Sequence, residues 1–186
     1  DVIESRGLGD VYKRQASLNK STFFRSFLSY LPIILLFFSV FNEFDFNYLK
    51  SDYFSFNFIF ILIFFWTLRN PDYLGYFSIF LAGIVNDVVI GIPIGISSFC
   101  YLLICAITSY IRQITLSPKF INDWLSFIVA VLLLNSIQVI ILDLIFLYQV
   151  DYMSYLINSG FTFLFYPLFF VLFNILNSKI SLKKND

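Results

Sequence analysis

The sequence contains no histidine, which removes the commonest proton shuttle and metal ligand of enzymes. It also lacks a Cys-x-x-Cys pair, a phosphate-binding loop ending in Gly-Lys-Ser/Thr and a Gly-x-Ser-x-Gly nucleophile motif. Its cysteines, Cys100 and Cys105, lie about 140° apart around one predicted helix, so they cannot pair with each other and are interpreted as small packing residues. We therefore expect no enzyme, no metal site and no cofactor.

Charge is scarce as well. Only 13% of the residues are charged and the formal net charge is zero, so the chain offers no basic face for nucleic acid. In contrast, 59% of the residues are apolar and the mean hydropathy is +0.83. Soluble proteins have roughly 45–50% apolar and about 25% charged residues. The composition therefore predicts a protein that lies in a lipid bilayer.

The first 15 residues differ from the rest because their composition is that of a soluble segment. We expect residues 1–15 to be an extraneous leader, and a disordered native tail is the alternative. No polar or Pro/Gly-rich linker interrupts the remainder, so residues 16–186 are expected to form a single transmembrane helical domain.

Six apolar segments approach the roughly 17 to 20 residues that a transmembrane helix needs. They are residues 24–41, 53–68, 73–90, 94–111, 124–147 and 154–177. This pattern predicts an all-α membrane protein of about six spans. With the amino terminus inside, the cytoplasmic side collects the residues Lys20, Arg25, Arg69, Arg112, Lys119, Lys179, Lys183 and Lys184, and only Lys50 falls outside. Both termini are therefore expected in the cytoplasm.

The third and fourth segments are separated only by residues 91–95, GIPIG, and should form an antiparallel hairpin. Gly91 and Gly95 permit backbone angles closed to other residues, and Pro93 stiffens the turn between them. Asp87 precedes this turn. Because a carboxylate at the bilayer centre costs about 2.5–3.5 kcal/mol, Asp87 should lie at the outer interface or be paired. It either organises the turn together with nearby carbonyls or contacts a partner or solute.

Small and polar residues recur at helical spacing along both helices of this hairpin. The third segment carries Gly75, Ser78, Ala82 and Asn86, and the fourth carries Tyr101, Cys105, Thr108 and Arg112. Such stripes let helix backbones approach closely in lipid. We interpret them as packing surfaces, and lining of a ligand site is the alternative.

Polar residues are fewer in the last two segments. Asn135 and Gln138 should hydrogen-bond to a neighbouring helix, with a transport pathway as the alternative, and Asp143 should lie near the outer interface. Pro167 should kink the last segment, with a neighbouring helix or a hydroxyl group satisfying the freed carbonyl.

A cytoplasmic corner is predicted where the second segment ends. Trp66 would anchor at the membrane interface, Arg69 would hold the loop inside, and Pro71 would begin the next segment. A rigid, exposed corner of this kind is a plausible recognition surface.

The centre of the chain, FFWTLRNPDYLGYFSIFLAGIVNDVVIGIPIGISSFCYLL, resembles the MreD family of rod-shape-determining proteins. The matching pattern is a Trp in the second segment, a Pro at the corner, and a helix ending in G-x-x-x-D-x-x-x-G-x-x-x-G. These positions are Trp66, Pro71, Gly83, Asp87, Gly91 and Gly95, and Pro167 matches a late Pro of the family. The likeness extends over roughly residues 20–186, and the heavy Phe and Ile usage is the departure from the family.

The resemblance implies a non-enzymatic subunit of the bacterial inner membrane that supports side-wall peptidoglycan synthesis. It implies as partners MreC, the actin-like MreB, the glycosyltransferase RodA and its penicillin-binding transpeptidase. It also implies a fold similar to the substrate-binding components of energy-coupling-factor transporters. A small-solute-binding component of a vitamin-type transporter is the alternative function, and a membrane-embedded enzyme is disfavoured by the missing histidine and the absence of clustered carboxylates.

Overall fold

The computed structural model describes residues 29–40, 55–115, 119–147 and 150–182, and every regular element in these ranges is a helix or a helical turn. The elements are the helix Ser29–Val40, α2 (Phe58–Arg69), the 3-10 turn η2 (Pro71–Tyr73), α3 (Tyr76–Ile90), α4 (Ile96–Ile114), α5 (Phe120–Ile140), the π-helical turn η3 (Ile141–Ile145) and α6 (Tyr152–Leu182). The predicted all-α class is confirmed. The predicted leader, residues 1–15, lies outside the described residues.

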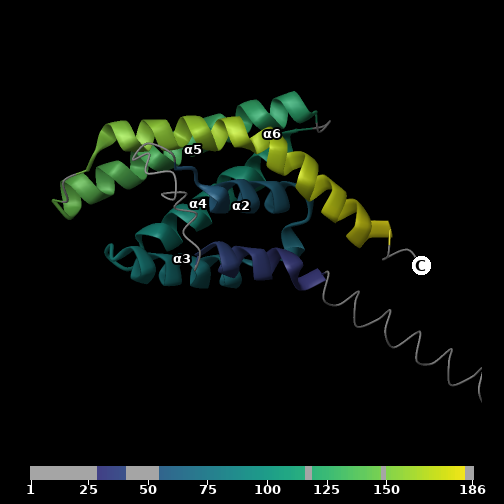
Figure 1. The fold of residues 1–186 in the computed structure, drawn as a ribbon, viewed down its shortest axis with the longest axis horizontal. Helices are drawn as coiled ribbons and strands as arrows, with labels where there is room; N and C mark the ends of the chain where they lie inside the picture. The colour runs from purple at the N-terminus through teal and green to yellow at the C-terminus, as the bar shows by residue number, and fades with distance from the viewer. Residues whose placement is uncertain (1–28, 41–54, 116–118, 148–149, 183–186) are drawn as a thin grey trace, which may run out of the picture.

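The helices are arranged in layers. Figure 1 shows α5 and α6 along one side of the molecule, α3 along the opposite side, and α2 and α4 between them. The direct contacts agree, since α4 packs against α2, α3 and α5, while α2 also packs against α6. The short α2 is therefore the central helix.

α2 is central because it is apolar on every face. Its residues from Phe58 to Leu68 are all buried, which is the pattern of a helix surrounded by others. Aromatic rings fill the space around it. Phe64 lies edge-on to Phe127 of α5 and Tyr166 of α6, with ring centroids 5.0 and 5.9 Å apart. Asn57 caps the start of the helix, where its Oδ1 accepts a hydrogen bond from Phe60 N at 3.2 Å.

The predicted hairpin is confirmed by the dense packing of α3 against α4. Gly91 ends α3 with φ +78°, and Gly95 begins α4 with φ +108°, so both adopt the left-handed region that glycine favours. An added Cβ would meet nothing within 4 Å at either position. The glycines are thus required by the backbone angles of the turn and not by a close approach of the helices.

The prediction that a neighbouring helix satisfies the carbonyl freed by Pro167 is confirmed. Pro167 lies inside α6, and Figure 1 shows this helix changing direction along its length. Because proline has no N–H, the carbonyl of Phe163 loses its helical donor. Trp124 of α5 supplies a replacement, since its Nε1 donates to Phe163 O at 3.0 Å and its ring stacks on that of Phe163 at 4.7 Å.

The outer surface of α5 and α6 is apolar. Two described stretches are long and apolar enough to cross a membrane, Phe120–Ile145 and Tyr152–Ile180, and only 33% and 22% of their most apolar parts are buried. Shorter apolar helices are Ser29–Val40, Phe58–Arg69 and Tyr76–Ile90. Water does not tolerate so large an exposed apolar face, whereas lipid does. The structure thus indicates a membrane protein, and the six-span topology and the transporter-like fold stay predictions.

Several predicted boundaries were wrong. The second segment begins at Phe58 and not at 53, since Asn57 caps the helix there. The third segment begins at Tyr76 and not at 73, because Pro71–Tyr73 forms a 3-10 turn and Gly75 has φ +64°. The fifth begins at Phe120 and not at 124, since Asp123 in its first turn interacts favourably with the helix dipole. The sixth runs to Leu182, because its polar end continues the helix beyond the apolar stretch.

Candidate functional site

Asp87 organises the turn between α3 and α4. Its carboxylate is fully buried and accepts hydrogen bonds from Gly95 N at 2.6 Å and from Ser97 N at 2.9 Å. Beside it, Asn86 Nδ2 donates to Ser97 Oγ at 3.0 Å. The turn interpretation of Asp87 is confirmed, but its partners are backbone N–H groups and not carbonyls, because a carboxylate accepts hydrogen bonds. The start of α4 also favours a negative charge at this point.

α3 and α4 approach each other closely at Gly83. A Cβ at this position would lie 2.5 Å from Ser98 N and 2.7 Å from Ser98 Oγ, and nearer still to Ser98 Cα. Ala82 is fully buried and Ser78 half-buried, whereas Gly75 is exposed. The predicted stripe therefore contributes to packing. The contact that most depends on a small residue is made by Gly83, the motif glycine that follows Ala82.

The predicted corner is only partly exposed. Trp66 is fully buried, so the expectation that it anchors at the membrane interface was wrong. Arg69 is 25% exposed, and its Nη2 lies 3.3 Å from Asp123 Oδ2 of α5. The guanidinium carbon also lies 5.5 Å from the centre of the Phe170 ring. The corner thus connects α2 to α5 and α6 within the protein, and only its exposed part is available to a partner.

A hollow adjoins this corner on its exposed side. It has a volume of about 410 Å³ and is lined by Pro71, Tyr76, Ser109, Arg112 and Gln113. The structure therefore brings together Pro71 and Arg112, which are far apart in the sequence. Arg112 is exposed at the end of α4, and no ion pair of its side chain occurs within the described residues.

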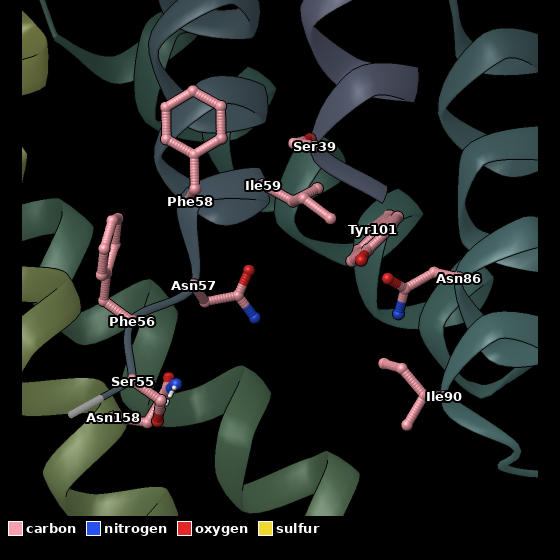
Figure 2. A pocket seen from close by; sticks show the side chains of 10 residues that line it. All are labelled: Ser39, Ser55, Phe56, Asn57, Phe58, Ile59, Asn86, Ile90, Tyr101 and Asn158. Atoms are coloured by element: carbon pink, nitrogen blue, oxygen red, sulfur yellow. Dashed lines mark hydrogen bonds between the residues drawn. The ribbon is translucent and has the colours of Figure 1, made fainter. Parts of the chain in front are cut away.

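The opposite end of the bundle contains a polar cavity of about 250 Å³, which we call the amide cavity. The described residues that line it are uncharged: Ser39, Ser55, Phe56, Asn57, Phe58, Ile59, Asn86, Ile90, Tyr101 and Asn158. Figure 2 shows the side-chain amides of Asn57 and Asn86 facing the open space from opposite sides, with Tyr101 between them. Four separate helices and the segment before α2 thus contribute polar groups to one place.

A second cavity, of about 230 Å³, shares Ser55, Asn57 and Asn158 with the amide cavity. Its other lining residues are Asn135, Gln138, Ser154 and Tyr155. The predicted hydrogen bond of Asn135 to a neighbouring helix is confirmed, because its Nδ2 donates to Ser159 Oγ at 2.6 Å.

Two acidic groups lie in η3 and just before α6. Tyr152 OH donates to Asp143 Oδ2 at 3.0 Å. Asp151 accepts from Ser154 Oγ at 2.6 Å and from Met153 N at 3.1 Å, and the hydrogen bond from the hydroxyl contributes most to lowering the pKa of the Asp151 carboxyl. Both carboxylates are therefore held in hydrogen bonds at this end of the bundle.

Sequence reasoning missed most of these cavity residues. It placed only Asn135 and Gln138 deep in the bundle and treated Asn86 as part of a packing stripe. Asn57, Asn86 and Asn158 are separated by 29 or more positions, and each has a structural hydrogen bond that explains it alone. The available signal was that each lies near a helix end on the same side of the membrane in the predicted topology.

The described residues show no arrangement for metal or nucleophilic chemistry. No group of three or more His, Cys, Asp or Glu side chains comes together in these ranges. Cys100 and Cys105 are both buried and free, in agreement with the interpretation that they pack. The polar groups that converge in the two cavities are amides and hydroxyls.

Residues 21–176 match the sequence model of a family described as rod shape-determining protein MreD. This range includes every residue of the resemblance described above, from Trp66 to Pro167. No curated protein and no solved structure matches the chain.

Proposed function

We propose that this chain, which belongs to the MreD family of rod shape-determining proteins, acts in rod-shape determination as a non-enzymatic scaffold of the cell-elongation complex. The observation that carries the proposal is the family match over residues 21–176. The buried, hydrogen-bonded state of Asp87 supports it, because the most conspicuous acid of the family motif serves the fold of the hairpin. The proposed location is the bacterial inner membrane, with several spans.

The proposed partners are MreC, RodA, the penicillin-binding transpeptidase and MreB. For the contact with a partner we propose the hollow beside the corner, since it joins Pro71, which follows the ion-paired Arg69 by two residues, to the exposed Arg112. A cation at the cytoplasmic side suits a partner with an acidic juxtamembrane segment. The motif residues Gly83, Gly91 and Gly95, together with Pro93, shape the hairpin that supports this surface.

The test uses a rod-shaped host depleted of its own MreD and expressing this chain. Cell width and recovery of MreC after mild detergent extraction are measured for the wild type, for Arg112→Ala and for Ser109→Trp, which fills the hollow. We expect wild-type cells to be rods, and both variants to widen the cells and lower MreC recovery. The matched control is Lys119→Ala, an exposed cation at the same end that does not line the hollow.

Rounded cells with the well-expressed wild-type chain would contradict a role in shape. Normal rods and full MreC recovery for both hollow variants would show that the partner contact lies elsewhere.

The topology has its own test. Reporter fusions after Lys50 and near Asp151 should be active outside, and fusions near Arg69, Arg112 and the carboxyl terminus should be active inside. An external carboxyl terminus with an internal amino terminus would refute six spans.

A further inference from the structure

We propose that the amide cavity binds a neutral, hydroxyl-rich ring, the chemistry of a sugar or polyol head group. The inference goes beyond the scaffold function and is independent of it. It begins from two polar atoms that face the cavity and that have no hydrogen-bond partner among the described residues. Asn57 Oδ1 accepts from Phe60 N, which leaves Asn57 Nδ2 without a partner among the described residues. Asn86 Nδ2 donates to Ser97 Oγ, which leaves Asn86 Oδ1 without one in the same ranges.

These two atoms are a donor and an acceptor on opposite walls, as Figure 2 shows. A hydroxyl group both donates and accepts, so a ring carrying several hydroxyls satisfies both walls at once. An apolar ligand would leave both amide groups buried and unpaired, which is costly in a membrane protein. The cavity therefore favours a ligand with hydrogen-bonding groups around its edge.

The charge of the lining favours a neutral ligand. Among the described residues, no Lys, Arg, Asp or Glu lines the amide cavity. Asp87, the residue after Asn86, already accepts two backbone hydrogen bonds and is fully buried. A phosphate or an ammonium group would enter without a counter-charge, and burial of an unpaired ion is strongly unfavourable.

Size and shape fit one ring. A volume of about 250 Å³ corresponds to about eight water molecules at about 30 Å³ each, the scale of a single six-membered sugar. Phe56, Phe58 and Tyr101 add aromatic surface for the C–H face of such a ring. The second cavity continues through Ser55, Asn57 and Asn158 and offers space for a substituent.

The lining is also held in place before any ligand arrives. Asn57 N donates to Thr162 Oγ1 at 2.8 Å, which fixes the segment before α2 to α6. Asn158 Nδ2 donates to Ser55 Oγ at 3.0 Å across the same gap. A site whose polar groups are already oriented loses little entropy on binding.

The ring has two possible sources, a free sugar or the head group of a membrane glycolipid. Both arms of the test use the full chain in phosphatidylcholine nanodiscs prepared without glycoside detergents. Binding is measured by calorimetry for methyl N-acetyl-β-glucosaminide, for dodecyl β-glucoside added to the nanodiscs, and for glucose 6-phosphate as the charged comparison. We expect binding of one or both neutral probes and at least tenfold weaker binding of the phosphate. Binding of only the dodecyl glucoside would assign the site to a membrane glycolipid.

Two variants with matched controls locate the binding. Ile90→Phe fills the cavity without removing a hydrogen bond, and Val89→Phe makes the same change on a neighbouring exposed residue that does not line it. Asn86→Leu removes the unpaired acceptor, and Asn177→Leu removes a comparable amide whose Oδ1 accepts from Asn70 at the other end. We expect Ile90→Phe and Asn86→Leu to raise Kd at least tenfold and the controls to leave it within twofold.

Absence of binding by both neutral probes would overturn the proposal, since the cavity would then hold water only. Equal Kd values for Ile90→Phe and Val89→Phe would also overturn it, because binding would lie elsewhere. Neither result touches the scaffold function, which is measured separately by cell width and MreC recovery.

Discussion

Replacing Gly83 with alanine should separate the two helices of the hairpin. The new Cβ would lie 2.5 Å from Ser98 N, while ordinary contacts of a Cβ begin at 3.4 Å, so α3 and α4 must move apart by about 1 Å. The obstacle is backbone, which cannot rotate out of the way as a side chain can. Overpacking of this kind typically costs 1–3 kcal/mol.

The movement would also strain the hydrogen bonds that cross the hairpin. These bonds join Gly95 N and Ser97 N to Asp87, Asn86 to Ser97, and Ser98 Oγ to Phe80 O, with lengths from 2.6 to 3.1 Å. Interhelical hydrogen bonds in membrane proteins are worth about 0.6 kcal/mol on average. With the overpacking term, we expect Gly83→Ala to lower the free energy of unfolding by about 3 kcal/mol.

The assay is unfolding in mixed micelles of increasing SDS content, followed by tryptophan fluorescence. The control is Gly160→Ala in α6, where an added Cβ meets nothing within 4 Å and the backbone is helical. Alanine there should be neutral or stabilise by up to about 1 kcal/mol. Equal stability of the two variants would refute the close approach. If adding Ser98→Gly restored the stability of the Gly83→Ala variant, the Ser98 hydroxyl, and not the backbone, would be the obstacle.

Three further predictions use the same assay. Trp124→Phe should lower the free energy of unfolding by about 1 kcal/mol, because it removes the donor to the carbonyl freed by Pro167. In a Pro167→Ala background, where α6 supplies its own N–H, the same change should have almost no effect, and equal losses in both backgrounds would contradict this role. Arg69→Met should cost about 2–3 kcal/mol because Asp123 is 2% exposed and loses its partner, and adding Asp123→Asn should recover part of that loss. Gly91→Val should cost about 1–2 kcal/mol and lower accumulation, since φ is +78°; accumulation equal to that after removal of an exposed lysine would show that the turn tolerates a side chain.

The hairpin could be predicted because its signals are local. Asp87, Gly91 and Gly95 lie within nine residues, and left-handed angles and a carboxylate beside a tight turn follow from residue type alone. The need for a donor near Pro167 was likewise predictable from the missing N–H. The identity of that donor was not, because Trp124 is 39 positions from Phe163 and only the packing of α5 on α6 brings them together.

Trp66 shows where a general rule failed. The preference of tryptophan for membrane interfaces predicted an anchor at the end of the second segment. The structure instead surrounds α2 with other helices, so both faces of this short helix are buried and Trp66 packs against Tyr73 and Phe173. A rule based on depth in the membrane cannot distinguish a residue facing lipid from one facing protein.

The amide cavity was hidden for a related reason. Asn57 looked like a helix cap and Asn86 like a packing residue, and each does make the bond that such a role requires. An amide has both a donor and an acceptor, however, so satisfying one half leaves the other available. Only the fold reveals that two such halves face one space.

The two ends of the bundle differ in a way that links orientation to binding. At one end Arg69 pairs with Asp123, and Arg112, Lys119 and Lys179 lie at helix ends nearby. At the other end the polar groups are amides, hydroxyls and carboxylates held by hydrogen bonds. Positively charged loops remain in the cytoplasm, so the cations favour an orientation in which the amide cavity opens outward. In that orientation a neutral sugar would reach the amide cavity from outside the cell, and the hollow beside Arg112 would face the cytoplasm.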